Sequence, residues 1–289
     1  MNYLIFDIGG TYTRFVFYKS SKKKIIERVE TVKNKKLYGF LEKTTKNILS
    51  KYNLKKFDGI VISAPGSLSC KEFKLIKPPN LPKVRNLQLS GLKKFTKKLI
   101  LENDANCAAL GAFKKYGSAK NSNLVCLTLG TGIGCGIITN KKLYKGEGKA
   151  SEFGHTTIDF NGRKCTCGNI GCLEEYVSTR GLLRIAKNNG LKVDCYELYD
   201  LANKGNKKAL KTYREYGNII AVALVNIANT LDPSVIVLTG GLSYASEFFL
   251  SHAKKKAKLG YFEGINPVIK CHSENLSLMG ALELIKNEK

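Results

Sequence analysis

"YLIFDIGGTYTRFVFYK", residues 3–19, opens the chain with two apolar, strand-like runs on either side of a glycine turn. Residues 3–7 form the first run and residues 14–18 the second, and a glycine pair between such runs is typical of a tight connection between strands. The same order of strand, glycine turn and strand returns in "LVCLTLGTGIGCGIITNKKLY", residues 124–144. Because this unit occurs once in each half of the chain, it predicts a protein of two lobes.

The segments around these two units alternate between strand and helix patterns. Apolar runs that end in loops or glycines predict strands around residues 25–32, in 58–66, at the start of 99–117 and in 234–243. Helical spacing of apolar residues predicts helices in 38–53, at the end of 99–117, within 179–228 and in 275–287. The alternation predicts an α/β protein, and 289 residues is a length at which one hydrophobic core usually divides into two.

Features of a secreted or membrane protein are not expected here. The first residues carry no basic segment, and Asp7 interrupts their apolar run, so a signal peptide is not predicted. The longest apolar stretch, residues 218–228, is too short to span a bilayer and contains Asn226. We therefore expect a cytoplasmic protein that does not interact with membranes.

The net charge of +25 admits two interpretations. One is attraction to a polyanion such as nucleic acid, and the other is a lysine-biased composition that decorates solvated faces. Only seven of the 48 basic residues are arginines, and the lysines are scattered in short runs without interleaved aromatic residues. We favour the second interpretation and expect no specific nucleic-acid partner, although a basic field would still attract an anionic nucleotide.

The two glycine turns are candidate phosphate-binding sites. In "FDIGGT", Gly9 and Gly10 would let backbone N–H groups approach phosphate oxygens, and Asp7 could hold Mg²⁺ through water. Neither this turn nor "TLGTGIGCG" (128–136) fits a Walker A loop or a dinucleotide fingerprint. A plain tight turn explains one such segment, but two of them favour phosphate held from both sides of a cleft. A third contact, near the nucleoside, could come from "TGGLS" (239–243).

Asp104 in "LENDANCAALGA" is the candidate catalytic base. It follows a predicted strand and begins a predicted helix, so a helix N-cap is the alternative explanation. An N-cap accounts for one polar residue but poorly for "ENDAN". Phosphoryl transfer needs a base close to the acceptor hydroxyl, and Asn103 could orient that acceptor by hydrogen bonds.

Three cysteines and a histidine have the spacing of a metal site. Nine residues separate His155 from Cys165, one separates Cys165 from Cys167, and four separate Cys167 from Cys172. Three thiolates and one imidazole form a closed tetrahedral zinc site, and Gly168 would help the loop wrap around the ion. The alternatives are a redox pair or inert thiols, but the usual C-x-x-C motif is missing. The other six cysteines are expected to be reduced, mostly buried residues.

With four protein ligands, such a site would be structural rather than catalytic, because no position remains for water. Glu152 lies three residues before His155, and Glu174 lies two residues after Cys172. The metal would therefore hold two carboxylates in place, and carboxylates are good bidentate partners for neighbouring sugar hydroxyls.

Together these segments resemble the ROK family (repressor, open reading frame, kinase) of sugar kinases, part of the actin-like ATPase superfamily. The segments that carry the resemblance, in family order, are "DIGGT" (7–11), "ENDANCAALGA" (102–112), "LGTGIGCGI" (129–137), "EFGH" (152–155), "CTCGNIGCLE" (165–174) and "LTGGLS" (238–243). The resemblance implies an actin-like (ribonuclease H-like) fold with a cleft. It implies a small lobe of residues 1–115, with the last helix (277–289) packing back on it, and a large lobe of residues 116–276.

The resemblance also implies roles for individual residues. ATP with Mg²⁺ would be held by Asp7, Gly9, Gly10, Thr11, Gly130, Thr131, Gly132, Gly240 and Gly241. Asp104 would be the base, and the sugar would contact Gly66, Asn80, Asn103, Asp104, Glu152, His155 and Glu174. His155, Cys165, Cys167 and Cys172 would bind structural Zn²⁺. The family often has glycine before "EFGH", where this chain has Ser151, and tryptophan after "NLP", where it has Val84 and Arg85.

The leading hypothesis is an ATP-dependent hexokinase, a glucokinase, that phosphorylates the C6 hydroxyl of glucose. Alternatives within the family are an N-acetylglucosamine, N-acetylmannosamine, mannose or fructose kinase, with polyphosphate as a possible donor in place of ATP. A non-catalytic sugar sensor is the alternative of another class. Because the first predicted strand begins at Tyr3, we expect no helix-turn-helix ahead of it and therefore no DNA-binding regulator. The family's habit suggests a homodimer or tetramer.

Overall fold

A computed structural model describes residues 1–20, 22–78, 81–272 and 275–287. The chain divides into two compact units. Unit 1 contains Met1–Lys115 together with Asn275–Lys289, and unit 2 contains Tyr116–Glu274. The C-terminal segment therefore returns to the unit in which the chain begins.

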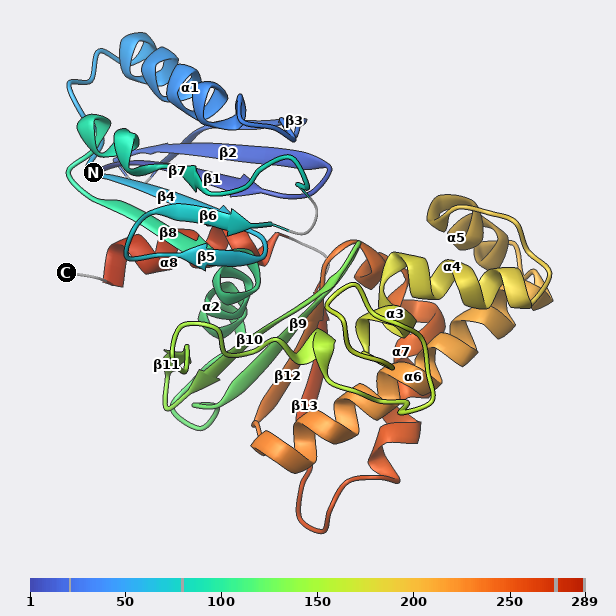
Figure 1. The fold of residues 1–289 in the computed structure, drawn as a ribbon. Coiled ribbons are helices and arrows are strands. Elements are labelled where there is room, and N and C mark those ends of the chain that lie inside the picture. The colour runs from blue at the N-terminus through green and yellow to red at the C-terminus, as the bar shows by residue number, and fades with distance from the viewer. Residues whose placement is uncertain (21, 79–80, 273–274, 288–289) are drawn as a thin grey trace. The chain divides into compact units, whose positions relative to one another are not determined.

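Unit 1 is built on a five-stranded mixed sheet of order β3-β2-β1-β4-β8 (Figure 1). Its strands are β1 (Asn2–Ile8), β2 (Tyr12–Lys19), β3 (Lys22–Glu30), β4 (Gly59–Ala64) and β8 (Leu99–Asn103). β1 pairs antiparallel with β2 and parallel with β4, and β4 pairs parallel with β8. β3, which carries consecutive lysines, is a mostly exposed edge strand, and charged side chains protect such an edge from pairing with other chains.

Both faces of the central strands are buried. Alternate side chains of β1 therefore join hydrophobic cores on opposite sides of the sheet. Leu4 and Phe6 join a core that includes Leu41 of α1 (Leu37–Lys51). Ile5 packs on the other face with Ile285 of α8 (Leu276–Asn287). The helices and remaining strands of unit 1 are α1 (Leu37–Lys51), η1 (Ser90–Phe95), α2 (Asp104–Tyr116), α8 (Leu276–Asn287), β5 (Ser67–Ser69), β6 (Lys74–Lys77) and β7 (Leu87–Gln88).

Helix α8 crosses α2 at two glycines. A side chain on Gly111 would place its Cβ 2.1 Å from the carbonyl oxygen of Leu276, and one on Gly280 would lie 1.7 Å from the carbonyl oxygen of Cys107. Only glycine permits so close an approach of two helix backbones. This crossing fixes the start of α8 beside the first turns of α2.

Unit 2 contains a second five-stranded mixed sheet, of order β11-β10-β9-β12-β13. Its strands are β9 (Leu124–Leu129), β10 (Ile133–Thr139), β11 (Lys142–Tyr144), β12 (Val235–Thr239) and β13 (Val268–His272). Its helices are η2 (Phe153–His155), α3 (Glu174–Val177), α4 (Thr179–Asn188), α5 (Cys195–Asn203), α6 (Lys207–Leu231), η3 (Gly241–Ala245) and α7 (Ser246–Lys258). Side chains from α4, α6 and α7 form one core with the sheet, and these helices lie together beside it (Figure 1). This arrangement confirms the expected α/β class.

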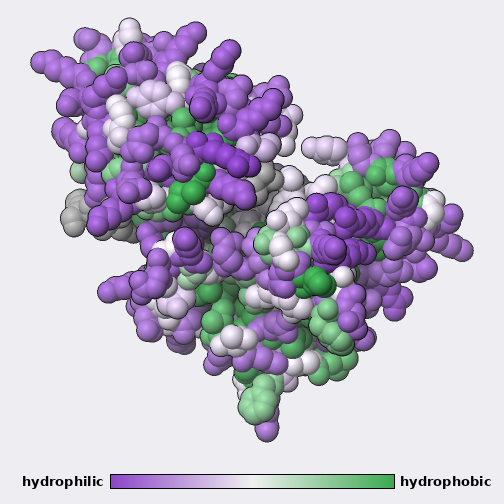
Figure 2. All heavy atoms as spheres, viewed as in Figure 1, coloured by the Kyte–Doolittle hydropathy of each residue, from purple (hydrophilic) through white to green (hydrophobic). Residues whose placement is uncertain are grey.

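The expected elements are present, with small differences at their ends. The strand expected around residues 25–32 is longer at its start, because β3 begins at Lys22. Of the six single cysteines, Cys107, Cys126 and Cys135 are buried as expected, whereas Cys195 and Cys271 are partly buried and Cys70 is exposed. No helix within the described residues is long and apolar enough to cross a membrane. Hydrophilic side chains cover much of the face seen in Figure 2, as the high lysine content predicts.

Candidate functional site

The first glycine turn joins β1 to β2 and is closed by backbone hydrogen bonds. The Gly9 amide donates to the carbonyl of Tyr12 at 2.9 Å, and a Cβ on Gly9 would lie 2.8 Å from that same oxygen. From beyond β3, the Thr31 hydroxyl donates to the Gly9 carbonyl at 2.8 Å, and the Thr31 amide donates to the Thr11 carbonyl at 2.9 Å. Thr11 is exposed and Gly10 half-exposed, so this turn presents its backbone to solvent.

Asp7, two residues before this turn, is buried and surrounded by donors, with 8% of its surface exposed. Its carboxylate accepts hydrogen bonds from Ser63 of β4 at 3.0 Å, from Ser277 at 2.7 Å and from Asn275 at 3.0 Å. The guanidinium of Arg14, its cross-strand partner, lies 3.6 Å away. Three neutral donors therefore fix the position of this carboxylate beside the turn.

Asp104 begins α2, directly after β8. The side-chain oxygen of Asn103 accepts the amides of Ala105 at 2.9 Å and Asn106 at 3.3 Å, so Asn103 is the residue that caps the helix. Asp104 also accepts the Ala105 amide, at 2.9 Å, and is half-exposed. Glu102, 2% exposed, supports the same turn by accepting the Asn106 side-chain amide at 3.0 Å.

Two other predicted sugar contacts belong to unit 1. Gly66 follows β4 with φ +77°, a conformation that favours glycine. Asn80 lies outside the described residues.

The second glycine turn joins β9 to β10. The Gly130 amide donates to the Gly132 carbonyl at 3.1 Å, and Thr131 between them is exposed. Gly240 follows the neighbouring parallel strand β12 with φ +96°, and a Cβ there would lie 2.5 Å from the carbonyl oxygen of Leu129. The segment that begins with Gly240 and Gly241 therefore lies against the second turn, as a shared nucleotide site requires.

The junction of α3 and α4 holds both ends of this second turn. Thr179 donates to the Gly130 carbonyl through its amide at 2.8 Å and through its hydroxyl at 3.1 Å. The Glu174 carboxylate accepts the Ile133 amide at 2.9 Å. The same oxygen would lie 2.7 Å from a Cβ on Gly132, so glycine leaves room for the carboxylate. Glu174, predicted as a sugar contact, is thus also bound to the backbone of the turn.

His155, Cys165, Cys167 and Cys172 lie together as the sequence predicts. Their ligand atoms are all within 4.8 Å of one another, so they could hold a metal ion. His155 Nδ1 lies 3.7 Å from Cys165 Sγ, and Cys167 Sγ lies 3.6 Å from Cys172 Sγ. A tetrahedral zinc ion with bonds of about 2.3 Å to sulfur and about 2.0 Å to nitrogen holds its ligand atoms roughly 3.5–3.8 Å apart. The spacing and chemistry of the four donors therefore fit zinc.

The two thiols of the close pair differ in acidity. A backbone hydrogen bond from Asn169 lowers the pKa of the exposed Cys167 thiol. Burial raises the pKa of Cys172 to about 12. Cys167 thus gives up its proton first, and binding of a metal cation would release the proton from Cys172.

Glu152 precedes the short helix η2, which ends at His155 and packs on the start of β10. Glu152 is exposed, and one of its oxygens lies 4.0 Å from His155 Nε2, the ring nitrogen that faces away from Cys165. Gly154 is buried, and a Cβ there would lie 2.5 Å from the carbonyl oxygen of Ile133. The candidate metal loop, the candidate sugar carboxylates and the second turn are therefore neighbours within unit 2.

Ser151 shows why glycine is common before "EFGH". Its φ is +75°, in the left-handed region that side chains disfavour, and its buried hydroxyl has no hydrogen-bond partner in the described part of the chain.

The residues that hold the predicted site residues in place were not predicted from the sequence. Ser63, Asn275 and Ser277 surround Asp7, but they are ordinary polar residues far apart in the sequence. Glu175, next to the predicted sugar contact Glu174, is 1% exposed and paired with two arginines, Arg180 and Arg184. The doubled acid in "CLEE" was a signal that could have drawn attention to it.

Known proteins resemble this chain in sequence and in structure. A sequence model described as "ROK family" matches residues 3–288. A glucokinase from Thermotoga maritima is 28% identical over 97% of this chain and 96% of its own length. A xylose repressor from Bacillus spizizenii is 38% identical over 64% of this chain. The chain spans about half the length of that repressor, of which 48% is covered.

Among solved structures, the chain resembles a ROK family glucokinase from Streptomyces griseus, which was crystallised with glucose and AMPPNP. The TM-score is 0.81 and the identity 25%, and the match covers 98% of this chain and 99% of that one. This likeness confirms the expected actin-like ATPase fold.

Proposed function

This chain belongs to the ROK family, and from that premise we propose that it is an ATP-dependent hexokinase that phosphorylates the C6 hydroxyl of glucose. The likeness to glucokinases over nearly the whole chain supports the proposal. An enzyme of this kind would act in sugar metabolism in the cytoplasm, as part of glycolysis. The homodimer or tetramer that the family suggests can be checked by light scattering.

In this proposal, Asp104 is the general base. The C6 oxygen attacks the γ-phosphorus of ATP, the bond from that phosphorus to the β–γ bridging oxygen breaks, and the hydroxyl proton passes to the Asp104 carboxylate. Products are hexose 6-phosphate and ADP. Backbone amides of the two glycine turns would bind the phosphates, and Mg²⁺ near Asp7 would supply positive charge.

The observation that carries the proposal is the place of Asp104, a half-exposed carboxylate that begins α2 directly after β8, beside Asn103, which caps the helix. Capping would have been a sufficient structural reason for an acid at this place. Asn103 accepts the amides of both Ala105 and Asn106, and Asp104 shares the Ala105 amide, so capping by itself does not account for an acid at this position.

The sugar would be bound by the Glu152 and Glu174 carboxylates, which the metal loop would hold in position. We propose that Glu152, His155 and Glu174 contact sugar hydroxyls in unit 2 and that Asn103 and Gly66 do so in unit 1. His155, Cys165, Cys167 and Cys172 would bind one zinc ion, which supplies structural order rather than chemistry. With Nδ1 facing the sulfur atoms, His155 leaves Nε2 for Glu152 or a sugar hydroxyl.

A sugar sensor is the second candidate function. The likeness to a xylose repressor, which is 38% identical over 64% of this chain, favours it. Such a chain would bind a sugar without phosphorylating it. Within the kinase proposal, an N-acetylhexosamine, mannose or fructose could replace glucose, since each differs by one or two hydroxyl contacts.

A panel of sugars and donors tests the proposal. Formation of the sugar phosphate is measured with glucose, mannose, fructose, N-acetylglucosamine and N-acetylmannosamine, with Mg-ATP or polyphosphate as donor. We expect the highest kcat/KM with glucose and ATP, and none with 6-deoxyglucose, which lacks the acceptor oxygen. Measurable sugar binding without turnover on any sugar would contradict the kinase and support the sensor.

A further inference from the structure

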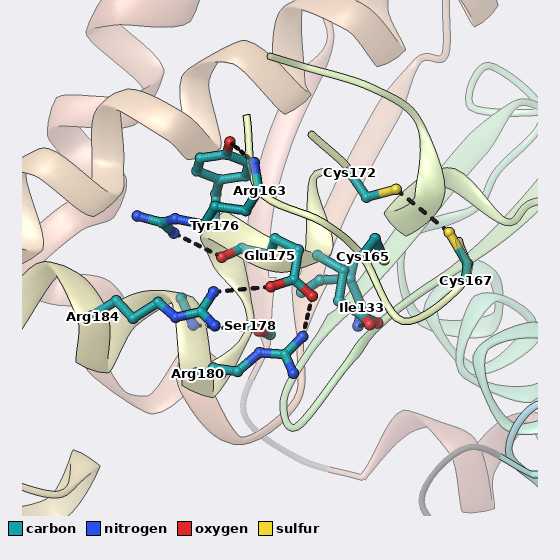
Figure 3. A network of polar contacts seen from close by, with 12 residues as sticks. Ile133, Arg163, Cys165, Cys167, Cys172, Glu175, Tyr176, Ser178, Arg180 and Arg184 are labelled. Atoms are coloured by element: carbon teal, nitrogen blue, oxygen red, sulfur yellow. Dashed lines mark hydrogen bonds and ion pairs between the residues drawn. The ribbon is translucent and has the colours of Figure 1, made fainter. Parts of the chain in front are cut away.

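Glu175 is a buried carboxylate that the proposed reaction does not use. It lies on α3 with 1% of its surface exposed. Two arginines of α4 neutralise it: Arg184 Nη1 lies 2.9 Å from one carboxylate oxygen, and Arg180 donates to the other (Figure 3). A buried charge is tolerated only when it is paired and hydrogen-bonded, so this arrangement holds α3 and α4 at a defined angle.

The opposite side of α3 is fixed by the metal loop. Arg163, which precedes Cys165 by two residues, donates to the backbone carbonyl of Glu175 at 2.9 Å. Its guanidinium lies 4.6 Å from the centre of the Tyr176 ring. The Tyr176 hydroxyl donates to Asp159 at 2.9 Å. It also accepts the Arg163 amide at 3.1 Å (Figure 3). Arginines therefore contact this short helix from both sides.

What this helix positions is the second glycine turn. Glu174 and Thr179, one on either side of the Glu175 ion pair in sequence, bind the Ile133 amide and the Gly130 carbonyl. A four-residue helix cannot hold such an angle by itself, because isolated short helices are unstable. The orientation of both contacts therefore depends on the paired charges behind them.

We propose that Glu175 is a positioning residue: with Arg180 and Arg184 it sets the α3–α4 junction so that Glu174 and Thr179 hold the Gly130–Ile133 turn in its phosphate-binding form. This inference rests on the proposed function for the assignment of the turn to phosphate. Through Glu174 it also joins the sugar-binding carboxylate to the phosphate-binding turn.

The variant Glu175→Gln tests the proposal, because it keeps the shape but leaves two arginines facing a neutral amide. Two quantities are measured: the hydrogen-exchange rate of the Ile133 amide by NMR, and the Kd for AMPPNP by calorimetry. We expect exchange at Ile133 to be faster, and AMPPNP binding weaker, by about tenfold each. Amides of β12 should exchange as in the wild type.

A matched control separates positioning from loss of stability. Ile227 is fully buried in the same core, on α6, and Ile227→Val lowers the stability of unit 2 without removing a charge or contact at the junction. We expect this control to leave exchange at Ile133 and the Kd near wild-type values. Arg184→Lys, which keeps the charge but loses the planar fork, should give an intermediate effect.

The proposal is overturned if Glu175→Gln, at a similar melting temperature, behaves as Ile227→Val does in both measurements. If Glu175→Gln does not fold, Arg184→Gln is judged by the same criteria, since Arg180 still pairs the carboxylate. A wild-type chain that binds no nucleotide would contradict the proposed function. Exchange at Ile133 would still decide whether Glu175 positions the turn.

Discussion

The two glycine turns share one contact and differ in where the acid comes from. In each turn, the carbonyl of the first glycine, Gly9 or Gly130, accepts the hydroxyl of a distant threonine. Two residues earlier, β1 carries Asp7, whereas β9 carries Thr128, whose hydroxyl accepts the Gly134 amide at 3.1 Å. The acid at the second turn is instead Glu174, which α3 supplies.

This difference suggests a division of tasks between the turns. The Asp7 carboxylate is built into the sheet and held by side chains from β4 and the start of α8, as suits a group that must hold a cation in one place. The second turn has a neutral hydroxyl on its strand, which does not repel an anionic phosphate. The acid of the second turn, Glu174, is carried by α3, and the candidate metal loop contacts α3. Changes in either segment can therefore disturb the geometry of the second turn.

The largest expected effect is on the chemistry of unit 1. Asp104→Asn should lower kcat roughly a thousandfold, because the acceptor hydroxyl loses its base. Binding of AMPPNP and glucose should change little, since Asn103 still caps α2. Rate measurements together with thermal unfolding check this. Turnover near that of the wild type in a folded variant would show that the base is another group.

The next effect should be confined to unit 2. Cys167→Ser removes one candidate ligand and should lower the melting temperature by roughly 10 °C, or about 3 kcal/mol for a unit of this size. It should also abolish the one zinc per chain that metal analysis is expected to find. Cys70→Ser is the matched control, because Cys70 is also exposed but lies outside the cluster. Equal behaviour of the two variants would disprove the metal site.

A pair of isosteric variants compares the two turns directly. Asp7→Asn should reduce kcat/KM for Mg-ATP about a hundredfold, because a charge that stabilises the bound cation is lost. Thr128→Val removes only one hydrogen bond to the Gly134 amide and should have less than about a tenfold effect. Titration with Mg²⁺ at saturating ATP checks both. Equal losses would remove the distinction drawn between the turns.

The smallest effects concern backbone strain, with one serine in each unit. Ser151→Gly should stabilise the protein by about 1 kcal/mol, because it relieves a φ of +75° and removes an unpartnered buried hydroxyl. Ser20→Gly relieves a φ of +50° at an exposed position and should contribute less. Denaturant unfolding measures both. A larger gain at Ser20 would mean that the Ser151 hydroxyl is satisfied in solution.

The sequence predicted the α/β class, the family and the gathering of His155 with three cysteines, because glycines, thiols and strand patterns have few alternative explanations. It did not predict that Asn103 caps α2, since Asp and Asn are equally good caps and only the structure distinguishes them. Nor did it predict the donors around Asp7. Ser277 lies 270 residues away, and contacts at that separation leave no local pattern.

The most direct test of the central claim is a ³¹P NMR spectrum of the product formed from glucose and Mg-ATP. The account predicts one new phosphomonoester signal, coupled to the two C6 protons of the sugar, that grows as ADP appears. A spectrum with no phosphorylated sugar, or with phosphate on another carbon, would contradict it.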